Sequence, residues 1–223
     1  MFITGGNRGI GKATAKSLAA AGASPIAIGS RRADATSSSA MAEIFAAARS
    51  ASRPPPTVIQ VLVDVSSQPT IDAAAAELSG LFDGRLDILV NNAGYMAPAP
   101  EAFADQPGAE YAKQLDVNLL GAVRVTKAFM PLLLAGSDRT IILLSSVGCQ
   151  ILGYGLGAYG IAKLALCRLA EYMLLEHGRD GVVAYPVHPG GVRTPLARGL
   201  PDEIYGELRF LSPPVLLNSE ADG

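Results

Sequence analysis

The chain has 223 residues, of which 49% are hydrophobic and 17% are charged, and its net charge is −2. This composition suits one large folded domain and is too apolar for a disordered chain. The small net charge, the absence of Trp and the lack of a basic cluster interleaved with aromatics argue against nucleic-acid binding.

Cysteine and histidine are too sparse to predict a metal site. Cys149 and Cys167 have neither a CxxC nor a metal-ligand spacing, and His177 and His188 form no cluster. Two free thiols suit a reducing compartment. No run reaches the roughly 18 apolar residues of a membrane span, and the N-terminus does not resemble a signal peptide. We therefore expect a cytoplasmic protein with no metal and no membrane partner.

A strand, a Gly-rich turn and a helix are expected at the N-terminus. Residues 1–4 read as a short apolar strand, residues 5–11 as the turn, and residues 12–21 as an Ala-rich helix that ends at Gly22. Such a turn lets backbone N–H groups at a helix N-terminus approach a pyrophosphate. The glycine spacing departs from the general G-x-G-x-x-G fingerprint, because Thr14 occupies the third position.

The rest of the chain alternates apolar strands with helices. Strands are predicted at 25–29, 58–63, 86–90, 140–144 and 182–187, and helices at 35–48, 70–82, 109–134 and 159–177. A Pro-rich loop covers 50–56, and the Pro/Ala-rich loop 95–108 is the weakest region for order. The alternation predicts an α/β fold with a parallel sheet covered by helices on both faces.

Polar and glycine motifs follow the predicted strands. They occupy 5–11, 30–32, 64–65, 91–94, 145–146 and 188–191. Ligands of such sheets bind beyond the carboxyl ends of the strands, so these motifs predict one common site.

Tyr159 and Lys163 stand four residues apart on a predicted helix and therefore share a face. A nearby cation favours the phenolate, so the pKa of Tyr159 is expected to fall toward neutral. The pair is a candidate general acid/base for a carbonyl/alcohol couple. The pattern is weak by itself and gains its meaning from the strand-end motifs.

Together these motifs resemble the classical short-chain dehydrogenase/reductase family. The likeness covers residues 1 to about 200 and is carried by Thr4-Gly5-x3-Gly9-Ile10-Gly11, Asp64-Val65, Asn91-Asn92-Ala93-Gly94, Asn118, Ser146, Tyr159-x3-Lys163 and Pro189-Gly190. The resemblance implies a single Rossmann-type, doubly wound parallel sheet over residues 1–223 that binds a nicotinamide dinucleotide.

The resemblance also implies catalytic roles. Tyr159 would exchange a proton with the substrate oxygen, and Ser146 would hydrogen-bond the same oxygen. Lys163 would bind the nicotinamide ribose and lower the pKa of Tyr159. Asn118 would hold a water that links Lys163 to solvent; a buried polar residue bonded to backbone is the alternative for it. Ser145 and Ser146 face opposite ways on a strand, so only one of them can be catalytic.

By the same likeness, the cofactor would be bound along the carboxyl edge of the sheet. The implied contacts to the phosphates are Gly5, Asn7, Arg8, Gly9, Ile10, Gly11 and Thr194 for the pyrophosphate, and Ser30 and Arg31 for the ribose phosphate. Those to the adenosine half are Asp64 and Val65 at adenine and Asn91, Asn92, Ala93 and Gly94 along the ribose and strand end, with Arg124 as a weaker candidate. Those to the nicotinamide half are Tyr159, Lys163, Pro189, Gly190 and Val192.

The second strand favours NADP(H) over NAD(H). It ends in Ser30-Arg31-Arg32, with no acid before Asp34 to bind a ribose 2′-OH. Arg8 adds a cation nearby, and guanidinium groups suit a phosphate. That Arg31 and Arg32 are ordinary solvated charges remains the alternative.

The C-terminal part departs from the family pattern. We expect residues 194–223 to form a short, atypical substrate-lid segment and the last strand of the family to be missing, which would expose a sheet edge. We expect an NADP-dependent oxidoreductase acting on a carbonyl or secondary alcohol, apolar or ring-containing, held by 95–105, 147–156 and 195–210. A homodimer or homotetramer through 109–134 and 158–177 is expected from the family. A catalytically silent dinucleotide-binding protein is the alternative.

Overall fold

The computed structural model describes residues 1–97, 101–192 and 194–197. The strands are β1 (Phe2–Thr4), β2 (Ile26–Ser30), β3 (Val58–Leu62), β4 (Ile88–Asn91), β5 (Thr140–Leu144) and β6 (Val183–Val187). The helices are α1 (Gly9–Ala20), α2 (Ala35–Ser50), α3 (Gln68–Leu81), α4 (Gly108–Leu115), α5 (Gly121–Ala135) and α6 (Gly157–His177). Short turns of helix are η1 (Asp116–Leu120), η2 (Val147–Cys149), η3 (Gly178–Asp180) and η4 (Pro195–Ala197).

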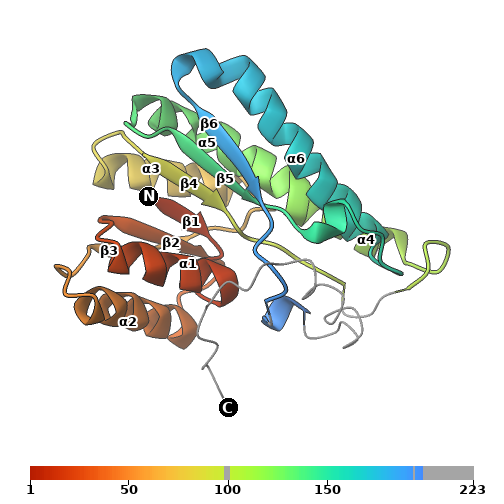
Figure 1. Ribbon diagram of the computed structural model, residues 1–223, viewed down its shortest axis with the longest axis horizontal. Helices are drawn as coiled ribbons and strands as arrows, with labels where there is room; N and C mark the ends of the chain where they lie inside the picture. The colour runs from red at the N-terminus through yellow and green to blue at the C-terminus, as the bar shows by residue number, and fades with distance from the viewer. Residues whose placement is uncertain (98–100, 193, 198–223) are drawn as a thin grey trace.

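The six strands form one parallel sheet in the order β3-β2-β1-β4-β5-β6 (Figure 1). The chain moves outward in one direction from β1 to β3 and then in the other from β4 to β6, so the topological switch point lies between β1 and β4. The predicted Rossmann-type sheet with helices on both faces is therefore confirmed.

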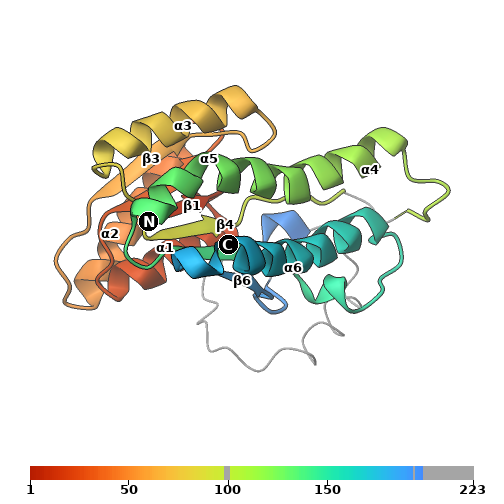
Figure 2. The ribbon, with the colours of Figure 1, turned by 90° about the horizontal axis from the view of Figure 1, so that it is seen from above.

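Two hydrophobic cores lie on the two faces of the sheet. One joins β-strand side chains to α3, α5 and α6 and includes Phe2, whose ring stacks on Phe129 with the centroids 4.8 Å apart. The other joins Ile3, Ile28 and Val90 to α1 and α2. Figures 1 and 2 show these helices layered against the sheet. β2 is buried along its whole length, which explains its continuous apolar sequence.

The predicted helix 109–134 is interrupted by a π-helical turn. The turn η1 separates α4 from α5, and the Gly121 backbone N–H donates to the Asp116 carbonyl, five residues earlier. This wider turn carries Asn118, which is buried. π-Helical turns are frequent at functional sites because they reposition a side chain without ending the helix.

The same helix, Gly108–Ala135, is long and apolar enough to cross a membrane by its length and its mean hydropathy of 1.4. This is weak support for a membrane span, because core helices of soluble proteins meet the same criterion. Here the helix contributes Val125, Phe129 and Leu133 to the hydrophobic core.

The expectation of a missing last strand falls on residues that the structure does not describe. Within the described residues β6 is the edge of the sheet, and Tyr185 and Val187 on it are exposed.

Candidate active site

The Gly-rich turn and the end of β4 are fastened together. Asn92 donates from Nδ2 to the carbonyls of Thr4 (2.8 Å) and Gly5 (3.0 Å). The Thr4 hydroxyl accepts from the N–H groups of Asn92 and Ala93, both at 3.0 Å. A Cβ at Gly11 would lie 2.4 Å from the Gly5 carbonyl oxygen, so α1 can meet the turn only with glycine there. The motifs at 5–11 and 91–94 thus build one structure.

The N-terminus of α1 is suited to an anion. Its N-cap residue is Arg8, whose side chain makes no capping hydrogen bond, and the first turn holds no acidic residue. The first N–H groups of a helix have no intrahelical acceptor, and the helix dipole adds positive potential. Gly5 and Gly9 adopt φ values of +63° and +54°, which lets the backbone turn tightly where it enters the helix. These features fit a dinucleotide pyrophosphate.

Buried hydroxyl groups hold the turn after β2. Ser30 and Ser37 both donate to the Arg32 carbonyl, at 2.8 and 3.2 Å, and Gln60 donates to it at 3.0 Å. The Asp34 carboxylate accepts from the Ser37 backbone N–H at 3.1 Å and so caps α2. The side chains of Arg31 and Arg32 are exposed.

The end of β3 presents Asp64 and buries Val65. Burial alone would raise the pKa of Asp64, but hydrogen bonds from Ser66 and the charge of Arg31 together lower it. Val65 packs where a Cβ on Gly121 would otherwise sit, 2.8 Å from its side chain. Arg124 bonds to Asp116 at 2.6 Å and to the Val65 carbonyl at 3.4 Å. Arg124 therefore links α5 to η1 and to the loop after β3.

Asn91 and Gly94 both meet the long helix. Asn91 donates to the Thr126 hydroxyl at 3.0 Å and is buried, so its side chain faces α5. A Cβ on Gly94 would lie 3.0 Å from Asn118 Oδ1, which explains why no side chain stands there.

Ser145 and Ser146 point to different partners. The Ser145 hydroxyl donates to the Lys163 carbonyl at 2.8 Å and is buried against α6. Ser146 caps η2 by accepting from Gly148 N–H at 3.1 Å, and it also hydrogen-bonds to Tyr159. Because the two successive side chains after β5 face different ways, Ser146 lies beside the Tyr159 phenol.

Tyr159 and Lys163 lie on one face of α6, with Lys163 Nζ 5.4 Å from the centre of the Tyr159 ring. Lys163 is 4% exposed and donates to the Leu144 carbonyl at 2.5 Å. Burial lowers the pKa of Lys163 to about 8. Among the residues that the structure describes, no other charged side chain is buried.

The expected fall in the pKa of Tyr159 is wrong for the protein without cofactor. Burial raises this pKa, and the hydrogen bond with Ser146 offsets the rise only in part. Lys163 does not contribute to this shift, and its ammonium group donates to the Leu144 carbonyl. Tyr159 therefore keeps its proton at neutral pH.

Both N–H groups and the oxygen of the Asn118 side-chain amide form hydrogen bonds within the protein. It accepts from Tyr95 N–H at 3.0 Å and donates to the carbonyls of Tyr95 (2.6 Å) and Gln114 (2.8 Å). Gln114 in turn accepts from Ala97 N–H at 3.4 Å. The buried side-chain amides of Asn118 and Gln114, one helical turn apart, thus bind the backbone of Tyr95 and Ala97 in the segment after β4.

The loop after β6 meets both the Gly-rich turn and the Ser146 loop. The His188 Nδ1 accepts from Val147 N–H at 3.0 Å, and burial lowers the pKa of His188. Gly190 has φ +89°, and Val192 N–H donates to its carbonyl. Thr194 lies 3.6 Å from the place of a Cβ on Gly9. Pro189 is partly buried in the same loop.

Sequence reasoning missed several polar residues of this region: Ser37, Gln60, Gln114 and Thr126, together with the role of His188. Most of their contacts join segments far apart in the chain. Gln114 alone carried a signal, because it stands one turn before Asn118 on the same helix.

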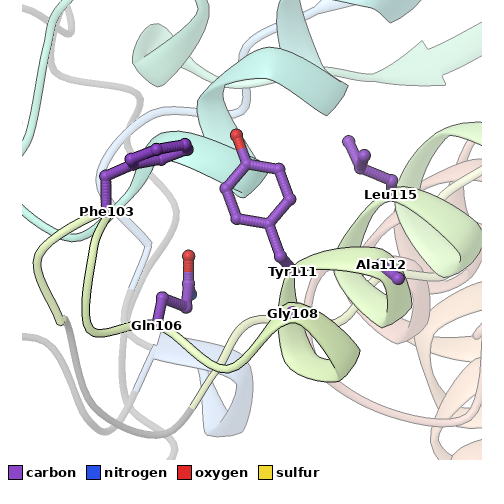
Figure 3. A pocket seen from close by; sticks show the side chains of 6 residues that line it. All are labelled: Phe103, Gln106, Gly108, Tyr111, Ala112 and Leu115. Carbon is purple, nitrogen blue, oxygen red and sulfur yellow. The ribbon is translucent and has the colours of Figure 1, made fainter.

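An open hollow of about 380 Å³ lies at the start of α4 (Figure 3). It is lined by Phe103, Gln106, Gly108, Tyr111, Ala112 and Leu115. The rings of Phe103 and Tyr111 meet edge-on at 6.0 Å. Tyr111 Oη is 3.8 Å from the place of a Cβ on Gly157, so the hollow borders the start of α6 but contains neither Ser146 nor Tyr159.

Comparison with known proteins defines the class to which this fold and site belong. The sequence profile described as short chain dehydrogenase matches residues 1–204. The short chain dehydrogenase mpl6 of Monascus purpureus is 38% identical over 208 residues, which are 93% of this chain and 70% of that protein. The chain belongs to the short-chain dehydrogenase/reductase family of oxidoreductases.

Solved structures give the same result. An alcohol dehydrogenase from the archaeon Thermococcus sibiricus, complexed with 5-hydroxy-NADP, superposes with a TM-score of 0.73 at 27% identity, over 94% of this chain and 88% of that one. The NADH-dependent reductase A1-R′, complexed with NAD, superposes with a TM-score of 0.72 at 25% identity, over 84% and 76% of the two chains.

Proposed function

We propose that this chain is an NADP-dependent oxidoreductase that interconverts a carbonyl compound and a secondary alcohol, with Tyr159 as the general acid/base. The observation that carries the proposal is the grouping of the Ser146 hydroxyl, the Tyr159 phenol and the buried Lys163 amine at the carboxyl end of β5. A hydroxyl, a proton donor and a cation are the groups that carbonyl reduction requires around the reacting oxygen.

Each side chain has a distinct task in this proposal. Tyr159 Oη gives its proton to the substrate oxygen in reduction and takes it back in oxidation. Ser146 donates a hydrogen bond to that oxygen and stabilises the negative charge that develops there. The dinucleotide, when bound, supplies or accepts the hydride. The raised pKa of Tyr159 keeps the phenol protonated, which is the state that reduction needs.

Lys163 supports Tyr159 and the cofactor. Its ammonium group donates to the Leu144 carbonyl, which leaves further N–H donors for the ribose hydroxyls of a nicotinamide dinucleotide. The carbonyls of Tyr95 and Gln114 accept both N–H groups of the Asn118 amide. A water that links this residue to Lys163 would therefore bind the second acceptor position of Oδ1 or the backbone of the π-helical turn. The uncapped N-terminus of α1 would hold the pyrophosphate.

The preference for NADP(H) rests on residues 30–34. The nearest acid, Asp34, uses its Oδ1 atom as the N-cap of α2, which makes it a less suitable partner for a ribose 2′-OH. Arg31 and Arg32 are exposed at the end of β2, where a 2′-phosphate would lie. The solved relatives carry either NADP-type or NAD-type ligands, so the likeness by itself does not choose between them.

We extend the proposal to a homodimer or homotetramer in the cytoplasm. The assembly is supported by a set of exposed apolar side chains on α6, namely Ile161, Leu164, Tyr172 and Leu175. The substrate would enter between the 95–105 segment, the residues after Ser146 and those after Thr194. The apolar side chains there favour an apolar or ring-containing ketone.

The decisive experiment measures NADPH oxidation with a panel of ketones for the wild type and for Tyr159→Phe. The variant should lose about 10²- to 10⁴-fold in kcat while its Kd for NADPH stays the same, because only the proton donor is removed. Wild-type turnover by the variant would refute the role of Tyr159. Binding of NADPH by the wild type without turnover of any ketone would favour a silent dinucleotide-binding protein instead.

A further inference from the structure

The two cysteines of the chain, far apart in sequence, lie together beside Ser146. Cys149 ends η2, and Cys167 lies near the middle of α6. The two elements touch closely at Gly160, where a Cβ would be 2.8 Å from the Gly148 carbonyl oxygen. Gly160, Lys163 and Cys167 are spaced three and four residues apart, so they share one face of α6, which η2 meets at Gly160.

Ser145 lies between the two thiols. Its hydroxyl is 3.4 Å from Cys167 Sγ and donates to the Lys163 carbonyl, which Cys167 Sγ also approaches at 3.5 Å. The Cys149 thiol lies beside Cys167 and Ser145 and interacts with both. Both cysteines are partly exposed, so small reagents can reach them.

The surroundings of Cys149 also affect its ionisation. Burial raises the pKa of Cys149, and the neighbouring Cys167 raises it further. Cys149 therefore becomes more nucleophilic as the pH rises. Neither thiol has a task in the proposed reaction, although the segment between them contains Tyr159 and Lys163.

We propose that Cys149 and Cys167 form a modification site for hydrogen peroxide, which converts them to an intramolecular disulfide. The thiolate of one cysteine attacks a peroxide oxygen, the O–O bond breaks, and hydroxide leaves, with a sulfenic acid formed on that sulfur. The second thiol attacks the sulfenic sulfur, the S–O bond breaks, and the oxygen leaves as water. In total two thiols and one peroxide yield one disulfide and two waters; the sulfurs lose two electrons and the peroxide gains them.

The disulfide would change the reactive centre. A bond between the end of η2 and α6 draws Cys149 toward Cys167, and Ser146 is the N-cap of η2. A shift of Ser146 relative to Tyr159 by a fraction of an ångström to 1 Å is expected to lower kcat about 10- to 100-fold. This effect on turnover rests on the proposed function, whereas formation of the disulfide does not.

The test treats the reduced full chain with a small excess of hydrogen peroxide at pH 8 and then alkylates any remaining thiols. The wild type should lose two hydrogens in intact mass, accept no alkyl group, and regain two alkylation sites after dithiothreitol. Cys149→Ser and Cys167→Ser are matched controls, each of which should form no internal bridge and should trap its single sulfenic acid with dimedone.

Three results would overturn the site: two alkylated thiols after peroxide, separate oxygen adducts on the two cysteines of the wild type, or only disulfide-linked dimers. Turnover is then measured before and after oxidation. Unchanged kcat in the bridged protein would refute the effect on Ser146 and leave the disulfide standing. Absence of turnover in the reduced protein as well would count against the proposed function alone.

Discussion

Asn118 binds both backbone polar groups of Tyr95 with one side-chain amide, accepting from its N–H at 3.0 Å and donating to its carbonyl at 2.6 Å. The contact joins the π-helical turn of the long helix to the segment that follows β4. It fixes the path of the chain at the point where β4 leaves the sheet and where Gly94 must pass below Asn118.

Replacing Asn118 with Leu should therefore destabilise the protein by about 1–3 kcal/mol, because the polar backbone groups of Tyr95 lose their partners. Asn118→Asp keeps the acceptor but loses the donor, so its stability should lie between that of the wild type and that of Asn118→Leu. Urea unfolding measures the difference, with the surface change Gln68→Ala as a control expected within about 0.5 kcal/mol of wild type. Equal stability of Asn118→Leu and wild type would show that water replaces the amide.

Burial of Lys163 predicts a pH-dependent stability. Its pKa is about 8 in the folded protein and 10.5 ordinarily. Between these values the unfolded chain binds more protons, so the free energy of unfolding gains a contribution that rises with pH. Lys163→Met removes this contribution. From pH 7.5 to 10.5, the free energy of unfolding of the wild type should therefore rise by about 3 kcal/mol relative to that of the variant. Parallel stability curves for the two proteins over this range would contradict the low pKa.

Two glycine-to-alanine changes should have opposite effects. At Gly11 the new Cβ would lie 2.4 Å from a backbone oxygen and 2.5 Å from Asn92 Nδ2, so Gly11→Ala should cost about 1–3 kcal/mol and weaken NADPH binding. Gly80 in α3 has no atom within 4 Å of its Cβ position. Gly80→Ala should stabilise by about 0.5–1 kcal/mol, because alanine favours the helix. Thermal unfolding of both variants would show whether the Gly-rich turn is packed as closely as the structure indicates.

Arg31→Ala tests the choice of cofactor. Loss of a charge-assisted hydrogen bond to a 2′-phosphate should weaken NADPH binding by roughly 1.5–3 kcal/mol, about 10- to 100-fold, and leave NADH binding unchanged. Arg49→Ala, an exposed arginine in the last turn of α2, is the matched control and should change neither affinity. Tighter binding of NADH than NADPH by the wild type, or no loss in the Arg31 variant, would refute the preference for NADP(H).

His188 should act as a positioning residue for the Ser146 loop. Because its Nδ1 accepts from Val147 N–H, the neutral ring is required, and burial lowers its pKa below 6.5. His188→Ala should lower kcat about tenfold with unchanged NADPH affinity, and His188→Asn, which keeps an acceptor, should restore most of it.

The pH dependence of the wild type offers a second readout for His188. With a folded-state pKa below the unfolded value, the unfolded chain binds more protons near pH 6, so the stability contribution of His188 is present above pH 6.5 and is lost as the pH falls. His188→Asn should lack this loss. The same decline below pH 6 in both proteins would assign it to other groups.

Much of the fold could be predicted because its signals are local. The Val- and Ile-rich strands, the glycines around α1 and the spacing of Tyr159 and Lys163 each depend on neighbouring residues. The break of the long helix at η1 could not be predicted in this way. It coincides with the Asn118–Tyr95 contact, which joins segments that only the fold brings together.

The sequence by itself determined the class of protein, the order of strands and helices, the edge of the sheet where a ligand is expected, and the residue types available for proton transfer there. These follow from periodicity and spacing, which act over a few residues. Tertiary structure alone decided which side chains are free for chemistry. It engages Asp34, Asn118 and Arg124 in internal hydrogen bonds, buries Tyr159 enough to raise its pKa, and brings Cys149 to Cys167. Burial and long-range contacts set these properties, and neither can be computed from local sequence because both depend on which distant segments share a surface.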